Sequence, residues 1–200
     1  MSERSNFSIK TIAKIAILAA VAVVLMLFDF PLPIAPSFYK LDLGDLPCLI
    51  GAFAMGPVPA LFIQIVKIAV KLLLKPTSTA FVGEAAAFIC SSALTVTAGA
   101  IYSRNKTKRN AIKGMVIGTV IMVLVASAAN YLFIIPAYVQ MFHLPLEAIV
   151  GMGHEIFPAV KDKFSFVLCC VLPFNLIKAV IVDILTYVLY KHISPLLKAR

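Results

Sequence analysis

The chain has 200 residues, of which 62% are hydrophobic and only 14% are charged, and its formal net charge is +9. Its mean hydropathy of +1.00 lies well above the values of soluble domains. So few charged residues cannot cover a soluble domain of this length, and the composition predicts one integral membrane domain over residues 1–200. The basic residues lie in short clusters between apolar runs, which is a topology signal and not a nucleic-acid-binding footprint.

Apolar stretches predict an all-α fold of six transmembrane helices, because a spanning helix needs about 20 apolar residues. Pro136 is expected to end the fifth helix. The second and third helices are too short to span upright, which indicates that they are tilted, broken or packed inside the bundle. In chain order, the predicted helices cover residues 8–28, 45–55, 60–74, 81–102, 112–135 and 164–190.

The distribution of lysine and arginine predicts the orientation in the membrane. Six helices place both termini and the loop 103–110 on one side, and this side carries most of the basic residues. Short basic loops remain in the cytoplasm. The sequence therefore predicts a multi-pass protein of the cell membrane with both termini in the cytoplasm.

Two long segments are predicted on the outer side, at residues 28–47 and 138–163. Four prolines in the first segment exclude a continuous helix there. The second segment is either a functional lid or a solvated connector. At the end of the first segment, Asp45 is expected to cap the following helix, because aspartate is a favoured N-cap residue.

An asparagine and a lysine lie at membrane depth in the last predicted helix. Asn175 and Lys178 interrupt the apolar run 171–180 and, being three residues apart, share one helix face. An ionisable group at this depth costs about 3 kcal/mol or more unless it is paired or hydrated, so it indicates a functional site. Asn130, in the antiparallel fifth helix, is predicted at a similar depth. Amide groups and an ammonium would suit a ligand edge of alternating carbonyl and N–H groups.

Each of these residues also has a structural interpretation. Lys178 could bond backbone carbonyls, and Asn130 could form an interhelical hydrogen bond. Glu84 is either a favourable charge at a helix N-terminus or a ligand contact. Lys40 and Asp42 could contact a polar ligand tail. Lysines 67, 71 and 75 form a stripe that lines either a wet cavity or the bundle exterior.

No catalytic or metal-binding pattern is present in the sequence. It contains no G-x-S-x-G, no H-E-x-x-H and no glycine-rich phosphate loop, and its four cysteines form no C-x-x-C pair. We therefore expect neither an enzyme nor a metal site, and no cofactor. A small membrane enzyme or a scaffold protein is the alternative from a different class.

Several motifs together resemble one family of membrane proteins. They are the run YKLDLGDLP at residues 39–47 after a proline-rich loop, Gly83-Glu84 opening the fourth helix, Asn130-Tyr131 with Pro136 in the fifth, and PFNLIK at residues 173–178. This combination resembles the riboflavin-specific substrate-capture subunits, or S components, of energy-coupling-factor vitamin transporters. The resemblance extends over essentially the whole chain. An S component for another vitamin is the nearest alternative.

The resemblance implies an S-component fold that binds riboflavin as a transported ligand and works with a transmembrane coupling protein and two cytoplasmic ATPases. The absence of an arginine cluster favours riboflavin over its phosphorylated form. Three alanines follow Glu84, where a polar residue is expected. Ala16 and Ala20 match the Ala-x-x-x-Ala face that meets the coupling protein in this family. The ligand contacts implied are Asn130, Asn175, Lys178, Asp42 and Glu84, with Lys40 and Leu41 from the same run as Asp42.

Overall fold

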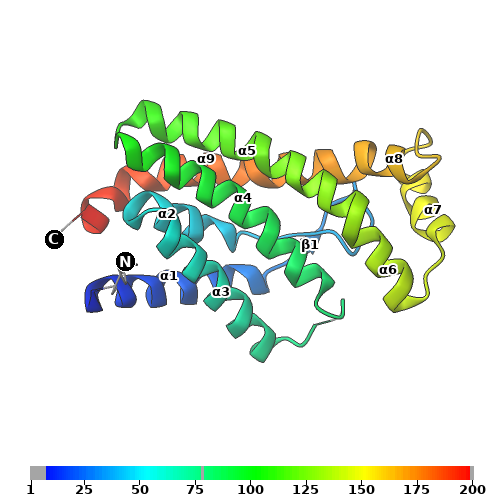
Figure 1. Ribbon diagram of the computed structural model, residues 1–200, viewed down its shortest axis with the longest axis horizontal. Helices are drawn as coiled ribbons and strands as arrows, with labels where there is room; N and C mark the ends of the chain where they lie inside the picture. The colour runs from blue at the N-terminus through cyan, green and yellow to red at the C-terminus, as the bar shows by residue number, and fades with distance from the viewer. Residues whose placement is uncertain (1–7, 78, 199–200) are drawn as a thin grey trace, which may run out of the picture.

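The computed structural model describes residues 8–77 and 79–198, the last nine of these by their backbone alone. It is an elongated bundle whose long helices run roughly along one axis (Figure 1). The start of α1 (Ile9–Leu27), the end of α9 (Leu172–Lys198) and the connection from α4 (Val82–Arg104) to α5 (Lys108–Ala129) lie at the same end of the bundle. We call this the terminal end, and the opposite one the loop end.

The first half of the chain follows the predicted boundaries closely. α1 begins after Ser8, whose hydroxyl accepts a hydrogen bond from the backbone N–H of Thr11. α2 covers Asp45–Met55, and α3 covers Pro57–Leu74, starting earlier than expected because Pro57 and Pro59 fit a first helical turn. Residues 45–53 of α2 are all buried, so this short helix is packed inside the bundle.

The prediction that Pro136 ends the fifth helix is wrong. α5 continues through a π-helical turn, η1 (Asn130–Ile134), into α6 (Ile135–Phe142). The backbone N–H of Ile135 bonds to the carbonyl of Asn130, five residues back, and Pro136 then occupies the first turn of α6, where a missing N–H is tolerated. A matching π-turn, η2 (Val167–Val171), joins α8 (Lys163–Phe166) to α9 just before Pro173.

Five helical stretches are long and apolar enough to cross a membrane. They confirm a multi-pass helical membrane protein, whereas α2, the second of the six predicted helices, has only 11 residues. The five are Ile9–Leu27, Pro57–Leu74, Val82–Arg104, Lys108–Phe142 and Lys163–Leu189.

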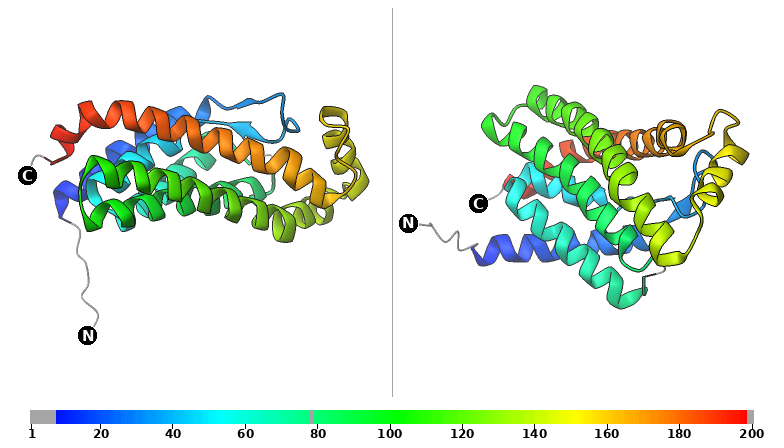
Figure 2. Two further views of the ribbon diagram at one scale, coloured as in Figure 1. Left: turned by 90° about the horizontal axis from the view of Figure 1, so that it is seen from above. Right: turned by 45° about the vertical axis from the view of Figure 1, so that its right-hand side comes forward.

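The loop end carries structure that the sequence did not predict. In the first long segment, β1 (Phe30–Pro31) pairs antiparallel with β2 (Lys40–Leu41), with Phe30 opposite Leu41. In the second, α7 (Leu146–Ile156) forms a short helix. Figure 2 shows the hairpin and α7 displaced from the terminal end toward the loop end.

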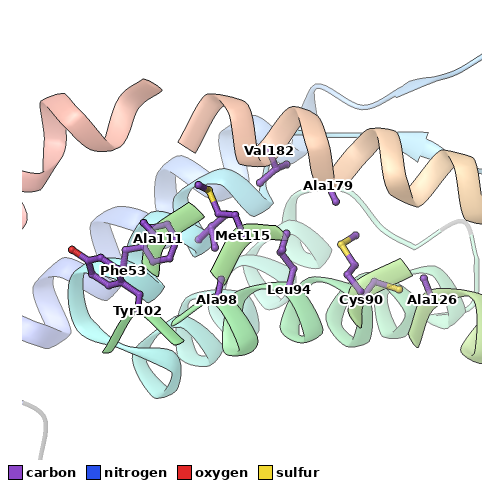
Figure 3. Packing of buried hydrophobic residues seen from close by; sticks show 12 residues of the cluster. Phe53, Cys90, Leu94, Ala98, Tyr102, Ala111, Met115, Ala126, Ala179 and Val182 are labelled. Atoms are coloured by element: carbon purple, nitrogen blue, oxygen red, sulfur yellow. The ribbon is translucent and has the colours of Figure 1, made fainter. Parts of the chain in front are cut away.

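The core near the terminal end joins α2, α4, α5 and α9 (Figure 3). α4 and α5 approach closely along a Gly-x-x-x-Gly stripe. A Cβ added at Gly114 or Gly118 would lie 2.9 Å from the backbone carbonyl oxygen of Ala98 or Leu94, respectively. Only glycine therefore permits this backbone contact. A second core, at the loop end, packs the first long segment against η2, α7 and α9.

Candidate functional site

A cavity of about 450 Å³ lies toward the loop end of the bundle. Its walls come from the first long segment, α3, α4, η1, α6, α7 and α9. The volume is that of a small-molecule site. Five aromatic side chains line it and give flat apolar walls: Phe38, Tyr39, Tyr138, Phe142 and Phe174.

Two asparagines on neighbouring helices face this cavity with fixed orientations. The Nδ2 group of Asn130 donates to the carbonyl of Ala126 at 2.8 Å, and its Oδ1 accepts from the hydroxyl of Tyr39 at 2.5 Å. The Nδ2 group of Asn175 donates to the carbonyl of Val171 at 2.9 Å. Each amide nitrogen carries a second hydrogen, and each carbonyl oxygen has a second lone pair. Both side chains can therefore offer a donor and an acceptor to a ligand.

The asparagines lie next to the π-turns. Asn130 opens η1, and Asn175 follows η2 by four residues. A π-turn inserts one extra residue into a helix and changes the direction of the side chains beyond it, and such turns are frequent at functional sites. The two turns also contact each other. The two inserted residues therefore change the side-chain directions of both helices at the same level of the cavity.

Lys178 belongs to a buried cluster of alternating charges. Its Nζ lies 2.9 Å from Asp42 Oδ2 and 3.2 Å from Asp45 Oδ2, while Lys67 Nζ lies 2.7 Å from Asp45 Oδ1. Ser91 donates a further hydrogen bond to Asp45. Two lysines thus balance two aspartates, which makes a buried charge cluster tolerable. Within the described part of the chain, the partners of Lys178 are carboxylates and not backbone carbonyls.

The prediction that Asp45 caps α2 is wrong. The N-cap residue is Gly44, without a side-chain cap, and Asp45 is the first helical residue, turned inward to the lysines. Asp42 instead stabilises the turn before α2, because its Oδ1 accepts a hydrogen bond from the backbone N–H of Gly44 at 2.8 Å. The attraction of two buried ammonium groups outweighs the weaker preference for an N-cap.

The lysine stripe of α3 lines a cavity and does not lie on the bundle exterior. Lys67 is buried in the cluster just described, and Lys71 and Lys75 line the cavity. Lys71 lies 2.6 Å from Glu84, whose second carboxylate oxygen accepts from Thr77 at 2.9 Å and from Thr79 at 3.1 Å. Glu84 therefore lies in the first turn of α4, at the cavity, with both oxygens engaged.

The outermost charge group lies at the mouth of the cavity. Lys75 lies 3.0 Å from one oxygen of Asp29, and Lys40 lies 3.6 Å from the other. Partial burial would raise the pKa of Asp29, but the hydrogen bond from Lys75 and the charge of Lys40 outweigh it and hold this pKa below its ordinary value. Asp29 is thus a carboxylate at neutral pH.

Six of the seven residues predicted to bind a ligand line this one cavity: Asn130, Asn175, Lys178, Asp42, Lys40 and Glu84. Leu41 does not; it is buried in β2 and packs in the loop-end core. Ala16 and Ala20 are exposed on α1 and do not line the cavity. Ala86 and Ala87, from the unexpected alanine run, form part of its wall.

Sequence reasoning did not single out several cavity residues. Tyr39, an aromatic residue of the first outer segment, suits the membrane interface by its sequence position, and Tyr138 lies beyond the proline expected to end the fifth helix. Asp29 gave no signal, because an acidic residue in an outer loop usually faces water. An aromatic residue beside charged loop residues was the available indication for Tyr39.

Two named riboflavin transporters are similar to this chain over most of its length. The riboflavin transporter RibU of Staphylococcus aureus (strain TCH60) is 30% identical over 189 residues, 94% of this chain and 93% of that protein. The riboflavin transporter FmnP of Bacillus subtilis (strain 168) is 24% identical over 190 residues, again 94% and 93%.

A solved structure of the S component of a bacterial ECF transporter superposes with a TM-score of 0.73 at 29% identity, covering 95% of this chain and 98% of that one. Residues 10–190 match the family described as ECF transporter, substrate-specific component. This match extends over most of the chain, which therefore belongs to the substrate-specific components of ECF transporters.

Proposed function

We propose that this protein captures riboflavin in the cavity and mediates its uptake across the cell membrane. The observation that carries the proposal is the placement of Asn130, Asn175 and Lys178 on one aromatic-walled cavity. The isoalloxazine ring of riboflavin is flat and largely apolar, with one edge of alternating carbonyl and N–H groups. Flat aromatic walls suit the ring, and the two carboxamides and the ammonium suit the edge.

The curated relatives support riboflavin as the vitamin. Both the S. aureus and the B. subtilis proteins are named riboflavin transporters, and each alignment covers 94% of this chain. The first long segment closes the cavity through two contacts to these same residues, Tyr39 to Asn130 and Asp42 to Lys178. A ligand that engages Asn130 and Lys178 therefore also touches the groups that hold the segment in place.

The remaining parts of the proposal concern orientation and coupling. In this proposal the terminal end faces the cytoplasm, as the basic loop at residues 104–109 indicates, and the cavity opens outward. Ala16 and Ala20 lie exposed one turn apart on α1, where small side chains permit close approach of another helix. We propose that this face docks on the transmembrane coupling protein, which with two cytoplasmic ATPases supplies the energy. The family is one of transporters, and the chain is not proposed to be an enzyme.

Riboflavin binding tests this proposal directly. Protein purified from riboflavin-containing cells should be yellow, with quenched flavin fluorescence. Asn175→Ala removes a hydrogen-bonding partner of a buried ligand edge, which costs about 1–3 kcal/mol and should weaken riboflavin about 5- to 150-fold. Asn105→Ala, an exposed site at the terminal end, is the matched control and should bind like the parent.

Lys178→Met should weaken binding similarly, but it also leaves Asp42 and Asp45 with one cation fewer. The double variant Asp42→Asn/Lys178→Met restores the charge balance and separates ligand contact from folding. Parental affinity in folded Asn175→Ala and in the double variant would exclude these residues from the ligand site. Tight binding of a different vitamin, with none of riboflavin, would favour another S-component specificity.

A further inference from the structure

We propose that the turn between α4 and α5, together with the adjoining seam between α5 and α9, binds an anionic glycerophospholipid of the inner leaflet. The turn, residues 104–109, supplies cations for the lipid phosphate. The seam supplies an apolar surface for an acyl chain. We call the turn and the seam together the lipid site. This inference goes beyond riboflavin binding and shares with the proposed function only the orientation in the membrane.

The turn carries four cations that have no carboxylate partner. Arg104, Lys106, Lys108 and Arg109 are exposed, and none of them forms an ion pair within the described part of the chain. The described acidic residues other than Asp183 belong to the first long segment, the buried charge cluster, the cavity wall or the outer stretch 147–162. The four cations are thus left for an anion from outside the chain.

Hydrogen bonds hold the turn in one conformation. The backbone N–H of Thr107 and the Nδ2 group of Asn110 both donate to the carbonyl of Asn105, at 2.8 and 2.9 Å. Thr107 Oγ1 accepts from the backbone N–H of Asn110 at 3.2 Å. Lys108 and Arg109 then occupy the first turn of α5, where cations oppose the helix dipole and destabilise the helix. The stability of α5 therefore does not explain these two residues.

Lys108 connects the turn to the seam between α5 and α9. Its ammonium lies over the ring of Tyr187 on α9, 5.2 Å from the ring centroid, in a cation–π contact. Ile112 and Val116 follow Lys108 in steps of four residues on the same face of α5, and Val180 lies seven residues before Tyr187 on the same face of α9. These apolar side chains and the Tyr187 ring are 41–58% exposed. Cations and an exposed apolar strip therefore adjoin along one seam.

The spacing of charge and apolar surface fits a lipid. Lys108 and Val116 are eight residues apart, a rise of about 12 Å along α5. This is close to half of a hydrocarbon core of about 30 Å. A lipid carries its phosphate at the headgroup level and its chains below it, and clusters of lysine and arginine beside the cytoplasmic ends of membrane helices attract anionic lipids. The positive-inside rule accounts for the side of the membrane, but not for the contact of Lys108 with the seam.

A protein partner fits this surface less well. An acidic segment would match the cations of the turn and leave the apolar strip uncovered. The face proposed for the coupling protein lies elsewhere, since α1 packs on α2 and α3 and runs along the edge of the bundle opposite α5 (Figure 1). The lipid site is therefore distinct from that docking face.

Selective retention of lipid tests the site. Purified protein in detergent is incubated with equal amounts of phosphatidylglycerol and phosphatidylcholine, and the retained lipids are measured by mass spectrometry. The parent should retain phosphatidylglycerol in preference, and added salt should reduce the preference. Lys108→Gln should lower the ratio of the two lipids about five-fold, and Lys106→Gln/Lys108→Gln/Arg109→Gln should abolish the preference. Lys161→Gln, at an exposed site of the loop end, is the matched control and should keep the parental ratio.

Riboflavin titration of the same preparations reads the cavity independently. All these variants should bind riboflavin like the parent, which also shows that they fold. Equal retention of the two lipids by the parent, or a ratio unmoved in the triple variant, would overturn the lipid site. Displacement of phosphatidylglycerol by an equal concentration of glycerol 3-phosphate would assign the turn to free phosphate and would also overturn it. Failure of the parent to bind riboflavin, with its lipid preference intact, would overturn only the proposed function.

Discussion

The lysine stripe of α3 provides a graded test of how burial sets the strength of an ion pair. Lys67, Lys71 and Lys75 each face one carboxylate at 2.6–3.0 Å, but their side chains are 1%, 13% and 46% exposed. Removing one partner of a fully buried pair leaves an uncompensated charge and costs about 3–5 kcal/mol. An exposed pair contributes at most about 1 kcal/mol. Substitution by methionine, of similar length, should therefore cost most at Lys67 and least at Lys75.

Thermal unfolding in detergent, without added ligand, measures the loss of stability caused by each lysine substitution. For a chain of this size about 1 kcal/mol shifts the melting temperature by about 2–4 °C. Lys67→Met should lower it by about 6–20 °C, Lys75→Met by no more than about 4 °C, and Lys71→Met by an intermediate amount. Asp45→Asn/Lys67→Met, which leaves Lys178 paired with Asp42, should recover at least half of the loss. Equal shifts at all three lysines, or a double variant less stable than Lys67→Met, would refute the reasoning.

Three further predictions concern topology, coupling and the first long segment. With the native cysteines replaced, an impermeant thiol reagent on intact cells should label Glu155→Cys and not Asn105→Cys; the reverse pattern would invert the proposed orientation. Ala16→Trp and Ala20→Trp should retain riboflavin binding in detergent while uptake and copurification with the coupling complex fall, and normal uptake in both would reject the docking face. Tyr39→Phe removes the hydroxyl that holds a cavity carboxamide and should weaken riboflavin about two- to ten-fold by speeding its release; unchanged release would show that this hydroxyl does not position the site.

The sequence was sufficient to locate the five long apolar helices and to bring three polar residues of the cavity together. Long apolar runs leave little choice but membrane helices, and polar residues in such runs must converge on one another or on a cavity. Asn130 therefore reaches the cavity from η1, and Asn175 and Lys178 reach the same cavity from α9. Whether they bind the ligand stays a prediction.

The parts that sequence reasoning missed depend on partners distant in the chain. The inward turn of Asp45 depends on Lys67 and Lys178, which are 22 and 133 residues away, so its local capping preference was misleading. The strands β1 and β2 have two residues each, too few to show a periodic pattern. The π-turns leave no periodic signal either, since a single inserted residue merely shifts the apolar face of a long hydrophobic helix.

The glycine contact between α4 and α5 limits where this protein can change shape. Gly114 and Gly118 bring the two backbones together with no side chain between them, so neither helix can slide or rotate past the other without a steric clash. We expect α4 and α5 to move together as one rigid unit that forms one wall of the cavity. We expect entry of a ligand to involve movement of the first long segment at the loop end, which polar contacts from Asp29, Tyr39 and Asp42 and the loop-end core hold to the helices. The barrier to loading would thus be set by the contacts of this segment and not by movement of α4 against α5.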